Sequence, residues 1–113
     1  MTLFEMLKGK KLDVQYETGF HFIMEYVEEG KLKWTSVGEV EDGGPSEEVD
    51  PYEVIELESG KYFINWIEES GMTISQLLDL NNNEVIAFLT WEDNSVRGGR
   101  DTLLQKGYVT IVG

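Results

Sequence analysis

The sequence predicts an all-β protein, an antiparallel barrel of about eight strands with a short helix at its N-terminus. Short runs in which apolar and polar residues alternate fill the chain after Lys10. Gly, Asn and Asp separate these runs, as expected for hairpin turns. A meander of this many strands tends to close, because closure removes exposed strand edges. The length of 113 residues suits one domain over residues 1–113.

The first residues predict a helix over residues 2–8. Thr2 and Glu5 have the spacing of a capping box, and the apolar residues around them recur at helical offsets. Gly9 follows and ends the pattern. We expect this helix to plug one end of the barrel.

The remaining elements are strands joined by hairpin turns, such as the one at Asn81-Asn82-Asn83. The predicted strands span residues 11–16, 20–27, 31–37, 51–58, 61–68, 72–80, 84–91 and 108–112. Residues 39–50 hold six acidic groups and no basic one, which indicates a solvated loop. A calcium site is the alternative, but the spacing does not match the Asp-x-Asp-x-Asp-Gly pattern of calcium loops.

Composition excludes several classes of function. Nine basic residues against 22 acidic ones give a net charge of −13, which would repel nucleic acid and anionic membranes. No apolar run approaches the roughly 20 residues of a membrane helix. The chain has no cysteine and one histidine, His21, so we expect no disulfide, no metal site and no cofactor. The absence of cysteine suits the cytoplasm, where we expect the protein to reside.

The strand over residues 61–68 carries the most informative row of side chains. Alternation places Tyr62, Ile64, Trp66 and Glu68 on one face, which we expect to be the barrel interior. Glu68 then lies either at the wet rim, as an ordinary turn residue, or inside a cavity. In an apolar cavity, desolvation would raise its pKa and make it a candidate general acid or base.

Tyr16 is the second candidate. It is in phase with Leu12 and Val14, so its ring faces the core. Its hydroxyl group either finds a partner within the core or donates to a ligand together with Glu68. Further aromatic side chains on these strands suit a flat, apolar ligand as well as they suit a solid core.

Two hairpins resemble one group of families. Tyr16-Glu-Thr-Gly-Phe20 resembles a hairpin near the start of bacterial phenolic acid decarboxylases, and Trp66 to Ser75 resembles their Trp-x-Glu-x-x-Gly-x-x-x-Ser segment. Residues 61–91 look equally like the MoaF-type domains. Together the likeness covers most of residues 10–91, and it implies the small lipocalin-like (calycin) barrel that both groups share.

Transferred residue by residue, the resemblance implies an incomplete decarboxylase site. Glu68 matches a glutamate that helps in proton transfer, and Tyr16 matches the second of two tyrosines that hold the substrate carboxylate. The first of these positions is Val14, which cannot donate a hydrogen bond. The family's arginine falls in the acidic loop, where Pro45 lies near its place, and the family's C-terminal extension is missing. We therefore expect the fold to carry over and decarboxylation not to.

The predicted function is a small-molecule-binding barrel of the MoaF-like group, with an aromatic or otherwise flat and apolar ligand. The expected ligand contacts are Tyr16, Phe22, Trp34, Tyr62, Trp66, Glu68 and Trp91. One alternative is a lyase that acts on a phenolic acid, with Glu68 as proton donor and Tyr16 as carboxylate holder. The other is a filled barrel that serves as a protein-interaction module.

Several strands are apolar on both faces, as where Leu77 stands beside Leu78 and Phe63 beside Ile64. A lone barrel would leave one of these sets exposed, and contiguous exposed apolar patches usually mark interfaces. We therefore expect a homodimer built on the strands of residues 61–91. Packing of the N-terminal helix on the outside is the alternative.

Overall fold

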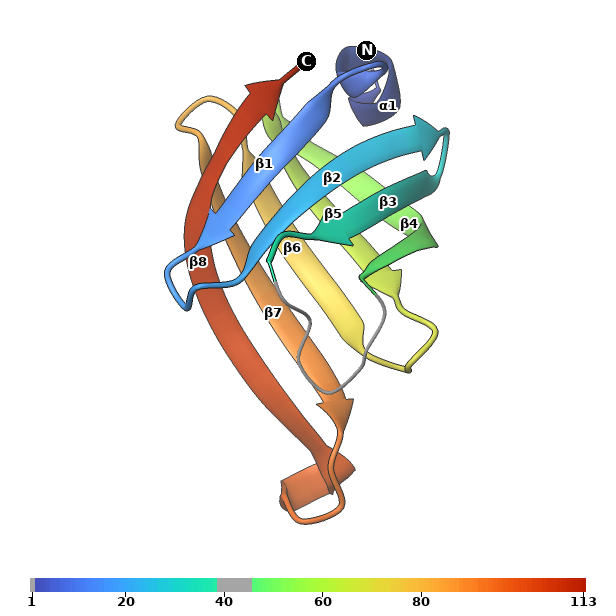
Figure 1. Ribbon diagram of the computed structural model, residues 1–113, viewed down its shortest axis with the longest axis vertical. Coiled ribbons are helices and arrows are strands. Elements are labelled where there is room, and N and C mark those ends of the chain that lie inside the picture. Colours follow the sequence, from blue (N-terminus) through green and yellow to red (C-terminus); the bar gives the residue numbers. More distant parts are fainter. Residues whose placement is uncertain (1, 39–45) are drawn as a thin grey trace.

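A computed structural model of the protein describes residues 2–38 and 46–113. It is a closed antiparallel barrel in which each strand pairs with the next and the last pairs with the first (Figure 1). The strands are β1 (Lys11–Tyr16), β2 (His21–Glu28), β3 (Lys31–Ser36), β4 (Glu47–Glu58), β5 (Lys61–Ile67), β6 (Thr73–Asp79), β7 (Glu84–Glu92) and β8 (Arg100–Val112). A short 3-10 turn, η2 (Arg97–Gly99), precedes β8. The predicted fold class is confirmed.

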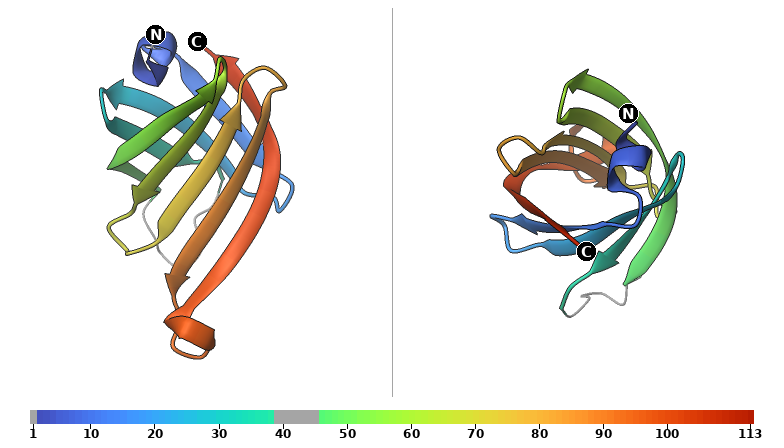
Figure 2. Two further views of the ribbon diagram at one scale, coloured as in Figure 1. Left: turned by 180° about the vertical axis from the view of Figure 1, so that it is seen from behind. Right: turned by 90° about the horizontal axis from the view of Figure 1, so that it is seen from above.

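The helix α1 (Leu3–Leu7) lies at one end of the barrel (Figure 2). The backbone N–H of Glu5 donates to the Thr2 hydroxyl oxygen at 3.1 Å, and the Glu5 carboxylate accepts from the Thr2 N–H at 3.0 Å, which completes the predicted capping box. Leu3 and Leu7 are buried in the barrel core. The helix therefore plugs this end rather than packing on the outside. In the described ranges, no helix has the length and apolar character needed to cross a bilayer.

The strand β4 begins earlier than its sequence indicates. It starts at Glu47 rather than at Pro51, so the predicted loop over residues 39–50 is shorter, and residues 39–45 of it lie outside the described part of the chain. Proline lacks the N–H that a sheet ladder uses, so within sheets it is confined to strand starts, edges and bulges. In the barrel, residues 47–51 pair with β3 and residues 52–58 pair with β5. Pro51 stands where β4 changes partners.

The strand β8 is also longer than predicted, because it begins at Arg100 rather than at Tyr108. Residues 100–108 pair with β7, and residues 107–112 pair with β1. The adjacent Leu103 and Leu104 and the glycine at Gly107 break the alternating pattern in the sequence. Both long strands are thus shared between two neighbours, which only the assembled barrel reveals.

Gly107 lies where β8 passes from β7 to β1. It pairs with Val85 on one side and Tyr16 on the other. A Cβ atom at Gly107 would lie 2.0 Å from the Gln15 carbonyl oxygen and 2.6 Å from the Tyr16 Cα. Both contacts are with backbone, which cannot swing aside. The absence of a side chain is therefore what lets β1 close against β8.

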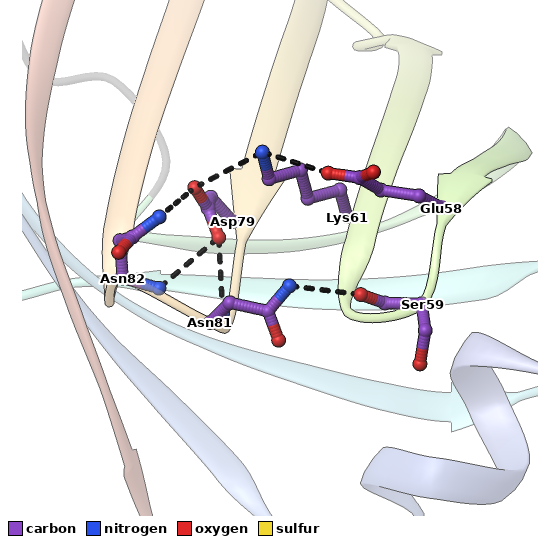
Figure 3. Close-up of polar contacts among 6 residues, drawn as sticks. All are labelled: Glu58, Ser59, Lys61, Asp79, Asn81 and Asn82. Atoms are coloured by element: carbon purple, nitrogen blue, oxygen red, sulfur yellow. Dashed lines mark hydrogen bonds and ion pairs between the residues drawn. The ribbon is translucent and has the colours of Figure 1, made fainter.

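A polar network joins two hairpin turns near α1 (Figure 3). The Asp79 carboxylate accepts from the backbone N–H of Asn81 at 2.9 Å and of Asn82 at 3.1 Å. The Asn81 side chain donates to the Ser59 carbonyl at 2.8 Å, which ties the β6–β7 turn to the β4–β5 turn. Lys61 pairs with Glu58 at 2.8 Å. These contacts order the plugged end of the barrel.

The outer surface of β4 to β8 carries apolar side chains that face solvent. The exposed fraction is 38% for Phe63 and 69% for Leu104. Six of these apolar residues are neighbours in the strand registers, and we call them the outer apolar patch. They are Ile55, Phe63, Leu77, Ile86, Phe88 and Leu104. Phe63, Leu77, Ile86 and Phe88 of this patch lie on the strands of residues 61–91, where we expect the homodimer interface. The dimer itself stays a prediction.

Replacing Gly107 with alanine should destabilise the barrel strongly, because the added methyl group overlaps the backbone of β1. We expect the free energy of unfolding to fall by about 3 kcal/mol, measured by urea denaturation. Gly30→Ala is the control: its φ of +81° strains an alanine, but no atom lies within 4 Å of the added methyl group, so it should cost about 1 kcal/mol. Equal losses in the two variants would contradict the closure argument.

Replacing Phe63 with glutamate should turn a dimer into a monomer, because a charge would enter the centre of the outer apolar patch. Sedimentation equilibrium of the wild-type protein and the variant measures this directly. Val49→Glu is the control, since Val49 is 51% exposed but pairs with Lys33, away from the patch. A monomeric wild-type protein would refute the predicted dimer.

Candidate functional site

The barrel encloses a cavity of about 680 Å³ at the end away from α1. Its walls come from the ends of β1, β3 and β5, the beginnings of β2 and β6, and the middle of β7 and β8. Five of the seven residues expected to contact a ligand line this cavity. These are Tyr16, Phe22, Trp34, Trp66 and Glu68.

Tyr62 and Trp91, the other two residues expected to contact the ligand, are not part of the lining of this cavity. Tyr62 faces inward but at the plugged end, where its hydroxyl group contacts the Met6 sulfur at 3.7 Å. Trp91 pairs with Asp101 near the end of the β7–β8 hairpin, which extends beyond the other strands (Figure 1). Alternation gives the face of a side chain but not its height along the barrel, and height separates these two residues from the rest.

Glu68 follows the last residue of β5 and reaches the cavity wall. The Trp66 indole Nε1 donates to its carboxylate at 3.2 Å. Burial raises the pKa of Glu68 to about 7, against the lowering effect of that hydrogen bond, and the negative charge of Glu48 raises it further. The sequence left two positions open for Glu68, the rim of the barrel and the inside of a cavity. The structure combines them, because Glu68 is half-buried at the mouth of the cavity.

A second carboxylate–indole pair lies on the neighbouring strands. The Trp34 Nε1 donates to Asp50 at 3.0 Å, and Asp50 is buried. Glu48 continues this inner row on β4. Burial and a hydrogen bond with Asp50 raise the pKa of Glu48, while the backbone N–H of Glu69 donates to its carboxylate at 3.2 Å. Asp50 and Glu48 were not identified from the sequence, because both belong to the predicted loop over residues 39–50.

Tyr16 meets a buried glutamine across the barrel. The Gln76 Nε2 donates to the Tyr16 hydroxyl oxygen at 3.2 Å and also lies 3.6 Å from the Met24 sulfur. The Gln76 carbonyl oxygen is buried without a partner. Burial raises the pKa of Tyr16 to about 12, so its phenol group is neutral at physiological pH. Gln76 is in phase with the buried Ile74 and Leu78, and a polar residue in an inward row is the signal that could have identified it.

Aromatic rings form one side of the cavity. Phe22 meets Trp34 edge to face at 6.0 Å between ring centroids, and it meets Tyr16 in the same manner at 6.4 Å. Such contacts hold the rings at fixed angles to one another. The result is a preformed apolar wall against which a flat ligand could pack.

The cavity offers few groups for binding an anion. Among the described residues, none of its lining side chains is lysine or arginine. Val14, at the position of the family's other tyrosine, is fully buried. The Arg100 guanidinium donates to the Gly71 and Thr90 carbonyl oxygens at 2.8 and 3.2 Å. His21 borders the mouth and contacts Asp13 at 2.7 Å.

Comparisons with known proteins agree with the barrel. The model of a family described as MoaF-like matches residues 8–103. A solved structure described as "Crystal Structure of a putative beta-lactamase from Burkholderia vietnamiensis" has a TM-score of 0.75 and 20% sequence identity, covering 92% of this chain and 93% of that one. At this identity the likeness concerns the fold alone. No curated protein matches the chain.

The pKa of Glu68 makes a prediction about stability. Its carboxyl group binds protons more strongly in the folded chain, at about 7, than at its ordinary value of 4.5. Between these two values the folded state holds more protons than the unfolded state, so stability should fall as pH rises. Glu68→Gln should flatten that decline in urea denaturation at a series of pH values. Glu69→Gln, an exposed neighbour in the same turn, should leave it unchanged; an equal effect would contradict the assignment.

Proposed function

The chain belongs to the MoaF-like family, and from that premise we propose that its barrel binds a small, flat, largely apolar molecule. The observation that carries the proposal is the cavity of about 680 Å³, which is lined by aromatic rings and closed at its far end by α1. Sites of this volume, mostly apolar with a few polar groups, are typical of small-molecule pockets. Tyr16, Phe22, Trp34, Trp66 and Glu68 would contact the ligand.

A lyase is the second candidate, and one observation favours it. Tyr16 and Glu68 line the same cavity, and Glu68 has a pKa of about 7, which suits a proton donor near neutral pH. A phenolic acid, however, would bring a carboxylate into a cavity whose described lining has no lysine or arginine, and whose one histidine, His21, already contacts Asp13. Burying an unpaired carboxylate costs several kcal/mol, as an order of magnitude. Binding without decarboxylation is therefore the better supported proposal.

The remaining proposals concern partners and location. A homodimer would form through the outer apolar patch, which lies on the opposite face of the sheet from the cavity, so ligand binding and dimerisation need not compete. A protein-interaction module is the alternative if the cavity holds no ligand. The net charge of −13 speaks against nucleic acid and anionic membranes as partners, and we keep the cytoplasm as the expected location.

Filling the cavity should abolish ligand binding without unfolding the barrel. Leu89 is half-buried and lines the cavity, whereas its neighbour Phe88 is exposed on the outside. We expect native mass spectrometry to find a small molecule retained by the wild-type protein and by Phe88→Trp, but not by Leu89→Trp. Equal retention by both variants would place the ligand outside the cavity and refute the proposal.

Incubation with 4-hydroxycinnamic acid separates the two chemical functions. We expect no vinylphenol product, because the cavity provides no described cation to hold the substrate carboxylate. Chromatography of the reaction mixture measures this, and Glu68→Gln serves as the comparison. Product formed by the wild-type protein and lost in Glu68→Gln would establish the lyase instead.

A further inference from the structure

Three acidic groups gather near the cavity mouth, whereas the one basic side chain in its described lining, His21, is already in contact with Asp13 at 2.7 Å. Glu68 lines the mouth, Glu48 is close enough to raise its pKa, and Asp50 in turn raises the pKa of Glu48. No described lysine or arginine forms an ion pair with any of the three. Carboxylates gathered at a partly buried site without a counter-charge favour a bound cation.

The two tryptophans that line the cavity add to the same preference. Each indole N–H is already used on a carboxylate, Trp34 on Asp50 and Trp66 on Glu68. What these residues offer to a ligand is therefore the ring. Aromatic faces attract cations, and tryptophan does so most strongly. A negative charge at the indole N–H adds to that attraction.

An independent observation in the cavity wall points to a hydrogen-bond donor on the ligand. Gln76 is 1% exposed, and its carbonyl oxygen has no partner. Its Nε2 is already occupied by Tyr16 and Met24. A buried acceptor without a partner costs about 1–3 kcal/mol, and a ligand that brings an N–H group would recover that cost. A carboxylate ligand has no hydrogen to donate.

The cation in question is organic. Among the residues that the structure describes, no three His, Cys, Asp or Glu side chains are arranged to hold a metal ion. The volume of about 680 Å³ and the aromatic wall suit a ligand with a flat body. A protonated amine attached to an aromatic ring meets both requirements, because the body packs on the rings while the amine donates hydrogen bonds.

We infer that the cavity selects aromatic amines in their protonated form, with Glu68 as the counter-charge and the Gln76 carbonyl oxygen as an acceptor. This inference rests on the proposed function and specifies the chemical class of its ligand. It also explains how an acidic protein would gather its ligand: the field of a strongly negative barrel raises the local concentration of cations and repels anions.

Three matched probes test the inference: tryptamine, tryptophol and indole-3-propionic acid. They share an indole-ethyl body and end in an ammonium, a hydroxyl and a carboxylate group. At about pH 8, where Glu68 is mostly ionised, isothermal titration calorimetry should rank tryptamine first. We expect it to bind about tenfold more tightly than tryptophol and the acid to bind most weakly. Added salt should reduce the advantage of tryptamine.

Variants assign the preference to particular side chains. Glu68→Gln should weaken tryptamine binding about tenfold while changing tryptophol binding less than about twofold. Gln76→Met keeps the side-chain volume but removes the hydrogen-bond acceptor, so it should weaken the binding of both tryptamine and tryptophol. Glu69 is exposed in the turn beside Glu68, so Glu69→Gln should leave the affinities for all three probes unchanged.

The outcomes separate the inference from the function on which it rests. If the alcohol or the acid binds as tightly as the amine, or if Glu68→Gln weakens amine and alcohol equally, the inference is wrong and the binding barrel stands. If none of the three probes binds to the folded protein, both are overturned.

Discussion

Closure of β8 onto β1 is the constraint on which the rest of this molecule depends. Until these strands pair, the chain is a twisted sheet with two free edges and no interior. Closure requires the backbones to approach at Gly107, where any Cβ atom would overlap the β1 backbone. Once the seam is formed, alternate residues of every strand are committed to the inside or the outside. Only then do the inward-facing aromatic rings and carboxylates surround a common interior.

Along the barrel axis the interior has two parts, one filled by apolar packing and one that contains the cavity. At one end α1 inserts Leu3 and Leu7, and the space is filled by apolar contact. At the other end nothing among the described elements fills the space, and the cavity remains. The same strands serve both ends, so a residue's height along the barrel decides whether it packs in the core beside α1 or faces the cavity. Tyr62 and Trp66, on one strand and one face, illustrate the two outcomes.

Acidic side chains inside a barrel require compensation, because desolvation penalises the charged form. Here that compensation comes from two indole N–H groups and a backbone N–H rather than from basic residues. Neutral donors leave the negative charge uncancelled. The preference for positive charge that we propose for the site depends on this, because a salt bridge would have removed it. This connects the composition of the chain, which is short of lysine and arginine, to the chemistry of its cavity.

Much of the fold and part of the site could be predicted from local pattern. The capping box at Thr2, the hairpin turns and the period-2 rows are properties of neighbouring residues, so the helix, the number of strands and the inward direction of Tyr16, Trp66 and Glu68 follow from sequence. Residues 47–50 and 100–107 were not recognised as strand, because Pro51 and Gly107 interrupt the pattern. Their extension depends on partners far away in the chain.

The sequence by itself determined which face each side chain takes, since alternation in a strand is a local consequence of backbone geometry. Only the tertiary structure decided which of those side chains meet. The pairing of Trp34 with Asp50, the contact of Gln76 with Tyr16, and the separation of Tyr62 and Trp91 from the cavity all depend on strand register and on the position of α1. Register is a property of the closed barrel, because each strand's place is set by two neighbours at once.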